Sequence, residues 1–457
     1  MMSSHRALWS QPETESNDPA RRRVFEFFAG KSASSRQRLE WAALFAGVLA
    51  AVLPSAKATG ETNGLLSQEV YIWQRTWNAP VRESLAQHAS PFSRLVALKA
   101  EVVWKQTQPQ IIRVALDWAA LRAAKRPIGL ALRIGAYPGP FESNSEITTS
   151  LVEQASSLVA EGKANQLQVG ELQIDFDCAE SKLDGYRVWV EAIRRKIAPV
   201  PLTITVLPTW LNQASFEPLI SATDGYVLQV HSFERPKDAD APFTLCDPAA
   251  ARRAAERAAQ FGVPFRVALP TYGYVMAFEH AGRFVGLSAE GPSQSWPEGV
   301  QLREVRADPV SLAHLVQTWT TNRPVTLAGI IWYRLPVSED SLNWRWATLS
   351  AVMAGRSPRE NLRAETRRPQ PALLEVSLVN DGEADSVAFP VVEVRWHNAR
   401  LVAGDGLRGF ELVDDGPAVA HFRRNPGRDR LSPGERWEIG WLRLDKDVEP
   451  QVEIRKP

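Results

Sequence analysis

Apolar and polar residues alternate strictly in the segment ELQIDFD, residues 171–177. Side chains alternate across a β-strand, so the pattern predicts a strand on which Gln173, Asp175 and Asp177 share one face. At a rise of ~3.3 Å per residue, the two carboxylates would lie about 6.6 Å apart along that strand. A protein core accommodates such groups only where they are paired or used. The segment therefore predicts a strand that also carries chemistry.

The same kind of pattern predicts seven further strands, most of them followed by helical periodicity. The strands are expected at residues 71–77, 95–104, 127–137, 201–210, 225–233, 264–274 and 326–335, with an additional extended segment at 111–118. Helices are expected at about residues 148–161, 183–197, 248–262, 309–320 and 344–354. Eight strands with intervening helices over about 300 residues predict a (β/α)8 barrel. An open doubly wound sheet is the alternative, but no Gly-rich phosphate loop follows the first strand, which argues against its nucleotide-binding form.

The pattern changes after residue 355. Residues 356–372 are polar, basic and rich in Pro, and they predict a linker. Residues 373–457 contain short strand-like runs without helices, which predict a small β-sandwich. The expected fold class is thus α/β, a TIM-type barrel over residues 66–355 followed by a C-terminal all-β sandwich.

An export signal is predicted within residues 1–58. The apolar run WAALFAGVLAAVL, residues 41–53, follows several Arg residues and precedes Ala56-Lys57-Ala58, an A-x-A cleavage pattern. The run is too short to span a bilayer, which needs about 20 residues, so no stable membrane span is expected. The basic region before it is long, so either translation starts downstream or the leader is atypical. The mature protein is expected to be periplasmic or secreted.

Composition narrows the classes of partner. The chain of 457 residues is 44% hydrophobic and 23% charged, which is ordinary for a globular protein. Its formal net charge of +1 gives no electrostatic reason to expect nucleic acid as a partner. The 16 Trp nearly equal the 17 Phe; Trp faces stack on sugar rings, although Trp also fills large cores.

HExxH, G-x-S-x-G and metal-spaced Cys/His clusters do not occur in the sequence, so neither a metal nor a cofactor is expected.

The ligand site of such a barrel is formed by the C-terminal ends of its strands, where this sequence places many polar and aromatic residues. Asp175 and Asp177 are the expected catalytic residues, although Asp175 also suits a structural pair with Arg133. His231 and Trp332 equally suit core positions. The residues expected to bind substrate are Gln173, Gln229, His231, Tyr272, Trp332, Arg133, Glu101, Trp104 and Trp210.

The chain has two cysteines, Cys178 and Cys246. In an oxidising compartment they would form one disulfide, which would hold the loop after the sixth strand over the site. Two buried free thiols are the alternative.

Several segments resemble one superfamily, in order around the eight strands. ELQIDFD resembles the fourth strand of chitinase-like glycoside hydrolases of family eighteen, whose pattern is D-x-x-D-x-D-x-E. VALPTYGY and LAGIIWYRL resemble that family's seventh strand and its eighth, which ends in a Trp under the sugar. LQVHSF occupies the place of its M-x-Y-D strand. Residues 66–355 also resemble an uncharacterised exported bacterial family, domain of unknown function three-one-four-two.

The resemblance implies a barrel that acts on a polysaccharide or glycan, with two departures. Asp177 takes the place of the family's acid Glu, and His231 takes the place of the Tyr that supports the oxazoline intermediate. A carboxyl with a raised pKa can protonate a leaving oxygen while a second, ionised carboxylate stabilises the cationic transition state. The expected function is therefore an exported glycoside hydrolase. A non-catalytic glycan-binding protein and a cell-envelope scaffold are the alternatives.

We predict that N-terminal sequencing of the mature protein will begin close to Thr59, because the Arg-flanked apolar run is followed there by an A-x-A pattern. A mature chain recovered from the cytoplasm with Met1 intact would contradict export.

Overall fold

The computed structural model describes residues 61–62, 64–105, 108–231, 236, 238–280, 282–289, 296–424, 427 and 429–455. The predicted export signal, residues 1–58, lies outside this range. Among the described residues, no helix combines the length and apolarity needed to cross a membrane.

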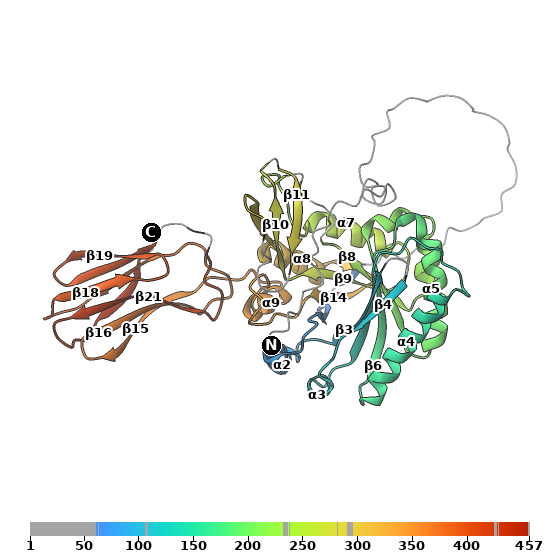
Figure 1. Ribbon diagram of the computed structural model, residues 1–457, viewed down its shortest axis with the longest axis horizontal. Helices are drawn as coiled ribbons and strands as arrows, with labels where there is room; N and C mark the ends of the chain where they lie inside the picture. The colour runs from blue at the N-terminus through green and yellow to red at the C-terminus, as the bar shows by residue number, and fades with distance from the viewer. Residues whose placement is uncertain are drawn as a thin grey trace, which may run out of the picture.

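Eight parallel strands close into a barrel (Figure 1). In order around the barrel they are β2 (Ser67–Ile72), β3 (Arg94–Lys105), β5 (Ile128–Ile134), β6 (Val169–Phe176), β7 (Leu202–Val206), β8 (Gly225–Gln229), β9 (Phe265–Pro270) and β14 (Leu327–Tyr333). The last strand, β14, pairs in parallel with β2, and β2 pairs with β3. An open sheet would leave two edge strands, so this closure confirms the barrel and excludes the doubly wound alternative.

Helices surround the barrel (Figure 1). They are α2 (Ala79–His88), α3 (Trp118–Ala123), α4 (Glu146–Ala164), α5 (Leu183–Ile197), α6 (Phe216–Ser221), α7 (Pro248–Ala259), α8 (Pro309–Thr321) and α9 (Trp346–Met353), with 3-10 turns η2 (Glu180–Lys182) and η3 (Pro208–Asn212). Local sequence sets their starts: Asp247 accepts hydrogen bonds from the Ala249 and Ala250 amides at the start of α7, whose first residue is Pro248. A capping Asp followed by Pro is a preferred way to begin a helix.

The structure corrects the predicted strands in three places. The first strand ends at Ile72 instead of residue 77. The extended segment predicted at 111–118 is β4 (Gln108–Arg113), which pairs antiparallel with β3 and is not a barrel strand. The seventh predicted strand divides after Pro270, because β10 (Gly273–Phe278) turns away into a separate sheet.

That separate sheet, here called the insertion sheet, comprises β10, β11 (Phe284–Ser288) and β12 (Gln301–Arg306). Its start requires Gly273, because a Cβ there would lie 2.5 Å from the Val305 carbonyl oxygen. The apolar alternation of the sequence runs on through this point, so the pattern alone predicted one continuous strand. A further pair, β1 (Glu61–Thr62) with β13 (Arg323–Pro324), is antiparallel.

The C-terminal region is a sandwich of two antiparallel sheets, as predicted (Figure 1). One sheet contains β15 (Leu362–Gln370), β16 (Leu373–Asn380), β21 (Arg436–Leu444) and β18 (Leu401–Gly406). The other contains β19 (Phe410–Gly416), β20 (Val419–Arg424), β17 (Val391–Arg395) and β22 (Gln451–Arg455). The two sheets share one apolar core. Strand β15 lies within residues 356–372, so the predicted linker is wrong there: the charged residues that suggested a linker belong to a solvent-facing strand.

The lower part of the barrel interior holds a buried ion-pair network. Arg266 of β9 donates through both terminal nitrogens to Glu171 of β6, at 2.9 and 2.8 Å, and also pairs with Glu69 of β2. Arg94 Nη1 lies 3.1 Å from Glu171 Oε2. Burial alone would raise the pKa of Glu171, but Arg266 and Arg94 outweigh it and hold that pKa below its usual value. For Glu69, burial outweighs the same cations and the pKa is raised.

We predict that Arg266→Met lowers the free energy of unfolding by about 3–5 kcal/mol, because it removes the closer cation of two buried carboxylates and leaves them the more distant Arg94. The pH dependence has a definite sign. The lowered pKa of Glu171 contributes stability above the ordinary Glu value of 4.5, and that contribution is lost as pH falls. The difference between wild type and variant should therefore shrink below that pH in urea titrations.

Arg252→Met is the matched control. It removes an exposed pair with Glu256 on α7, where Nε and Oε1 are 3.6 Å apart and the side chains are 56% and 58% exposed. That change should cost less than about 0.5 kcal/mol. Equal losses in both variants would show that the buried network does not hold the barrel together.

Candidate active site

Asp175 and Asp177 lie at the C-terminal end of β6, at the mouth of the barrel. The face that carries them points inward. Gln173, two residues earlier on the same face, is fully buried, and its Nε2 donates to the Tyr71 hydroxyl of β2 at 2.7 Å, across the barrel. The alternating pattern therefore places the Asp175 carboxylate on the inward face, whereas Asp177 follows the last residue of β6 and is exposed at the mouth.

A row of alternating charges crosses the mouth at the level of Asp175. Asp175, Arg133 and Glu101 are direct register partners on the adjacent strands β6, β5 and β3. Arg133 lies between the two carboxylates, with Nε 3.8 Å from Asp175 Oδ2 and Nη1 3.7 Å from Glu101 Oε1. Arg75, in the loop after β2, donates to both Glu101 oxygens, at 2.8 and 2.7 Å. Asp175 Oδ1 also accepts from Thr205 Oγ1 at 2.7 Å. These contacts hold the Asp175 carboxylate in a fixed orientation.

The environment of Asp177, two residues further along the chain, is different. Its side chain reaches solvent, yet protein atoms crowd it at the mouth. This partial desolvation, together with the negative charge of Asp175, raises the pKa of Asp177 to about 6, while Arg133 acts in the opposite direction. The two carboxyls therefore differ in the way that acid and base roles require: one is held by cation and hydroxyl contacts, and the other retains a proton at mildly acidic pH.

An aromatic group lines the opposite side of the mouth. It comprises Tyr71, Trp73, His231, Tyr272 and Tyr333, whose neighbouring ring centroids are 5.2–5.9 Å apart. The Tyr272 hydroxyl lies 3.3 Å from His231 Nδ1 and 3.0 Å from the Tyr274 hydroxyl. Burial lowers the pKa of His231 to about 3, so its imidazole is neutral near pH 7. His231 can accept or donate a hydrogen bond there, but it is not a cationic acid.

Trp332 is not a residue of the mouth, contrary to the expectation from the sequence. It is fully buried, its indole Nε1 donates to Gln68 Oε1 at 2.7 Å, and its ring contacts Trp344. The next residue, Tyr333, joins the aromatic group instead. Successive side chains of a strand point to opposite faces, so an error of one residue in the inward position exchanges the two roles. The expectation that Trp332 underlies a bound sugar is therefore wrong.

Trp210 and Trp104 also lie outside the aromatic group. Trp210 is fully buried in η3 beside Tyr186, so it is a core residue instead of a sugar contact. Trp104 is half-buried; its Nε1 donates to the Gly135 carbonyl at 3.0 Å, and its ring stacks on Tyr137 at 4.6 Å. Tyr137 in turn stacks on Trp189 of α5, so Trp104 belongs to the rim of the barrel beside α5.

The remaining expected residues take intermediate places. Gln229 is half-buried at the end of β8, and its Nε2 donates to the His231 carbonyl at 3.4 Å. Glu101, Arg133 and Gln173 serve the carboxylates from neighbouring or facing strands. Tyr71, Trp73 and Tyr333 also belong to the mouth, although the sequence did not single them out as site residues. The two-residue spacing of Tyr333 from Ile331 on β14 is the signal that could have identified it.

The predicted disulfide is wrong. Cys178 and Cys246 are both free and buried thiols. Burial raises the pKa of each to about 12, so neither is a thiolate near neutral pH. Cys246 lies just before α7, beside a cavity of about 460 Å³ lined by residues such as Val230, Phe243 and Leu245. The two cysteines therefore act as small apolar core residues.

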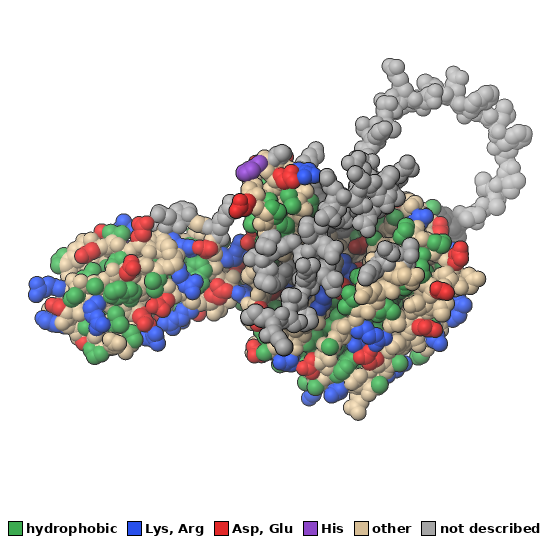
Figure 2. Space-filling model, viewed as in Figure 1, with side chains coloured by type: hydrophobic (Ala, Val, Ile, Leu, Met, Phe, Trp, Pro, Cys, Tyr) green, Lys and Arg blue, Asp and Glu red, His purple; other side chains and the backbone are tan. Residues whose placement is uncertain are grey.

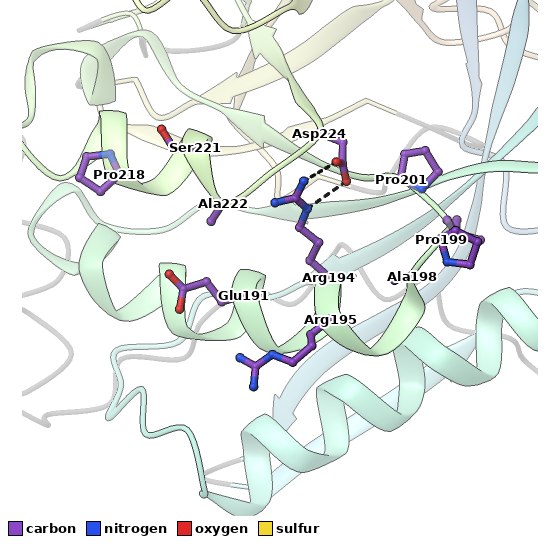
Figure 3. Close-up of a pocket in the computed structure, with 11 residues that line it drawn as sticks. Glu191, Arg194, Arg195, Ala198, Pro199, Pro201, Pro218, Ser221, Ala222 and Asp224 are labelled. Atoms are coloured by element: carbon purple, nitrogen blue, oxygen red, sulfur yellow. Dashed lines mark hydrogen bonds and ion pairs between the residues drawn. The ribbon is translucent and has the colours of Figure 1, made fainter.

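A larger groove lies at the other end of the barrel. Its volume is about 800 Å³, and it is lined by the last turns of α5, by α6 and by the segments that precede β7 and β8. Figure 3 shows Arg194 of α5 pointing to Asp224, with Nη2 2.6 Å from Oδ1. The carboxylates sit at the C-terminal strand ends, so this groove is separate from them. Among the described residues, no three His, Cys, Asp or Glu side chains form a group that could hold a metal ion.

Comparisons with known proteins place two family models on the chain. Both are described as domains of unknown function: DUF3142 matches residues 126–338 and DUF8456 matches residues 363–445. The first match lies on the barrel and the second on the sandwich. The expected resemblance to the first family is thus confirmed for residues 126–338. No curated protein matches the chain.

Solved structures similar to this chain include glycan-acting barrels of low sequence identity. The spore cortex-lytic enzyme SleL of Bacillus megaterium QM B1551 is 11% identical, with a TM-score of 0.46, covering 65% of this chain and 75% of that one. A chitinase from Chromobacterium violaceum ATCC 12472 is 15% identical, with a TM-score of 0.44, covering 63% and 99%. The GH18 chitinase ChiB of Flavobacterium johnsoniae is 12% identical, with a TM-score of 0.44, covering 64% and 94%.

We predict that the Asp177 carboxyl titrates near pH 6 in a ¹³C NMR titration, well above the ordinary Asp value of 3.8. Asp175→Asn should lower this midpoint because it removes a neighbouring negative charge. Arg133→Gln should raise it because it removes the cation that favours the ionised form.

Asp184→Asn is the control, since Asp184 lies in the first turn of α5, accepts from Ser215 Oγ at 2.6 Å and is not among the charges that shift the pKa of Asp177. It should leave the Asp177 midpoint unchanged. A wild-type midpoint near 3.8 would remove the basis for assigning Asp177 as a proton donor.

Proposed function

We propose that the protein is an exported glycoside hydrolase that cleaves a polysaccharide or glycan at the C-terminal mouth of the barrel. One observation carries this proposal: a pair of neighbouring carboxyls at the end of β6, of which Asp177 has a pKa raised to about 6 and Asp175 is held by Arg133 and Thr205. Glycoside hydrolysis requires such a division between a proton donor and an ionised carboxylate.

Asp177 is the general acid in this proposal. It stands nearest to solvent at the strand end, where a glycosidic oxygen can reach it, and its raised pKa keeps part of the population protonated at mildly acidic pH. Protonation of the leaving oxygen assists cleavage of the bond to the anomeric carbon.

Asp175 is the electrostatic partner. Its two oxygens have fixed neighbours: Thr205 donates to Oδ1 at 2.7 Å, and Arg133 Nε lies 3.8 Å from Oδ2. A carboxylate held in this way stabilises positive charge that develops on the sugar ring in an oxocarbenium-like transition state. It also raises the pKa of Asp177, so it supports both halves of the reaction.

One ring of the aromatic group, that of Tyr333, supports a sugar as the ligand, whereas the other four members of the group are buried. Tyr333 is half-buried at the mouth, and rings of this kind present an apolar face to a sugar while their hydroxyls bind its polar edge. A non-catalytic glycan-binding protein would need only this aromatic surface. The raised pKa of Asp177 beside a second carboxylate favours the hydrolase, because binding alone has no use for it.

We predict that Asp177→Asn lowers turnover by about 10²–10⁴-fold on the substrate that the mature protein cleaves, because the amide cannot donate the proton. The substrate should be found with a panel of chitin, peptidoglycan, cellulose, xylan and β-glucan. Wild-type kcat/KM should fall as pH rises through about 6, because the acid loses its proton there.

Asp184→Asn provides the matched control, with the same chemical change on α5 and unchanged turnover expected. Full activity of Asp177→Asn would show that another group is the acid. If the wild-type protein binds a glycan of the panel and releases no product from any, the binding alternative replaces the hydrolase.

A further inference from the structure

The sandwich contacts parts of the barrel that border the mouth. Figure 1 shows the insertion sheet rising beside the barrel next to the sandwich, and Figure 2 shows charged side chains of both signs at the junction. Several contacts cross this junction, among them the hydrogen bond from Thr348 of α9 to the Glu383 carbonyl. Two of them are Arg–Glu pairs near the mouth. One joins Arg430 of the sandwich to Glu304 of β12, and the other joins Arg345, the residue before α9, to Glu435 of the sandwich.

The insertion sheet is directly connected to the aromatic group. Its first strand, β10, follows β9 after two residues and carries Tyr274, whose hydroxyl lies 3.0 Å from the Tyr272 hydroxyl. Tyr274 is paired with Val305 of β12, and the next residue of β10 is paired with Glu304. The position of β12 therefore determines where Tyr274 stands relative to the mouth.

Arg430 holds β12 at that point. Its Nη2 lies 2.7 Å from Glu304 Oε1, and its Nη1 lies 3.2 Å from Asp385 Oδ2 within the sandwich. Arg306 Nε also donates to Glu304 Oε1, at 2.5 Å, and its Nη2 donates to the Ser341 carbonyl. Asp385 thus fixes the Arg430 side chain within the sandwich, and Glu304 is the partner of Arg430 on the insertion sheet.

The second contact reaches the loop after β14. Arg345 Nη2 donates to Glu435 Oε1 at 2.6 Å, while its Nη1 donates to the Ser338 carbonyl at 2.6 Å. The same loop accepts a hydrogen bond from Gln74 at the Leu335 carbonyl, so it borders the loop that carries Arg75. The sandwich is therefore attached to two separate borders of the mouth.

We propose that the sandwich is a fixed support for the barrel mouth and that Arg430 is a positioning residue: through Glu304 and β12 it sets the place of Tyr274. The proposal concerns the arrangement of the mouth in the absence of any ligand. Only its consequence for cleavage, a correctly placed aromatic wall for a sugar, rests on the proposed hydrolase function.

The expected effect is local, because β12 has other anchors. Arg303 donates to the carbonyl of Ala239 at 2.9 Å, and the Trp344 indole donates to the Ala307 carbonyl at 3.0 Å. Arg430 and Glu304 are 26% and 39% exposed, and a pair of this exposure changes a local equilibrium about two- to five-fold. Its loss should thus displace Tyr274 in part of the population while the barrel stays folded.

The test is ¹⁹F NMR of the full mature chain carrying 3-fluorotyrosine at its seven tyrosines. Tyr274→Phe identifies the Tyr274 resonance by its disappearance. Arg430→Ala should shift or broaden that resonance. It should leave unchanged those of Tyr186, a buried residue of α5, and Tyr226, whose hydroxyl donates to the Ala258 carbonyl of α7. Arg430→Lys, which can still pair with Glu304, should restore the wild-type resonance.

Arg367→Ala is the matched control. It removes an Arg–Glu pair that lies inside the sandwich, in which Arg367 Nη2 is 2.6 Å from Glu375 Oε2. Amide exchange at residues 301–306 should be about two- to five-fold faster in Arg430→Ala and unchanged in Arg367→Ala. A Tyr274 resonance that does not respond to Arg430→Ala overturns the proposal, as does an equal shift of all seven resonances. Neither readout uses a substrate, so these outcomes do not depend on whether the protein cleaves a glycan.

Discussion

The closure of the barrel, combined with the two-residue period of β6, is the constraint on which the site depends. Closure between β14 and β2 makes the inner face of β6 an enclosed surface, and the period sends Glu171, Gln173, Asp175 and Asp177 onto that face. Each polar side chain inside the barrel then needs a partner from another strand. Arg266 matches Glu171 at the bottom, the Tyr71 hydroxyl matches Gln173, and Arg133 with Thr205 matches Asp175. Solvent takes over at the level of Asp177.

The partners differ from level to level, so the carboxyls at the two ends of β6 have pKa values shifted in opposite directions. At the bottom, cations outweigh burial for Glu171 and its pKa falls, which is the behaviour of a structural ion pair. At the mouth, burial and Asp175 outweigh Arg133 and the pKa of Asp177 rises to about 6. The same segment thus supplies a stabilising anion in the core and, just beyond the end of the strand, a carboxyl that keeps its proton at mildly acidic pH. The difference arises from which side chains face each level, because the chemical group is a carboxyl in both cases.

The sequence predicted those parts of the fold that follow from periodicity. The eight strands, most helices, the sandwich and the inward face of β6 all depend on two- or 3.6-residue patterns, and the structure confirms the barrel and the sandwich. The prediction was wrong where the apolar alternation continues across a point at which the chain leaves one sheet and enters another. The alternation of TYGYVMAF continues from β9 into β10, so only the close approach of Gly273 to β12 marks the division. Trp332 and Tyr333 show the same limit at one residue: both fit an apolar strand end, and only the pairing of neighbours decides which faces inward.

His231 and the insertion sheet show how the mouth is organised around neutral groups as well as charges. A buried imidazole with a pKa near 3 cannot act as a cation, so its contribution is a hydrogen bond to the Tyr272 hydroxyl. That hydroxyl also meets Tyr274, the first side chain that the insertion sheet places at the mouth. Each of these groups is positioned by a different element: β8, β9, and β10 held through β12. A hydrogen-bonded chain across three elements keeps its geometry only if all three are fixed. Strand β10 is paired with β12, whose Glu304 is held by Arg430 of the sandwich. The C-terminal domain therefore reaches the mouth of the barrel through Arg430, Glu304 and β12, although it lies outside the barrel.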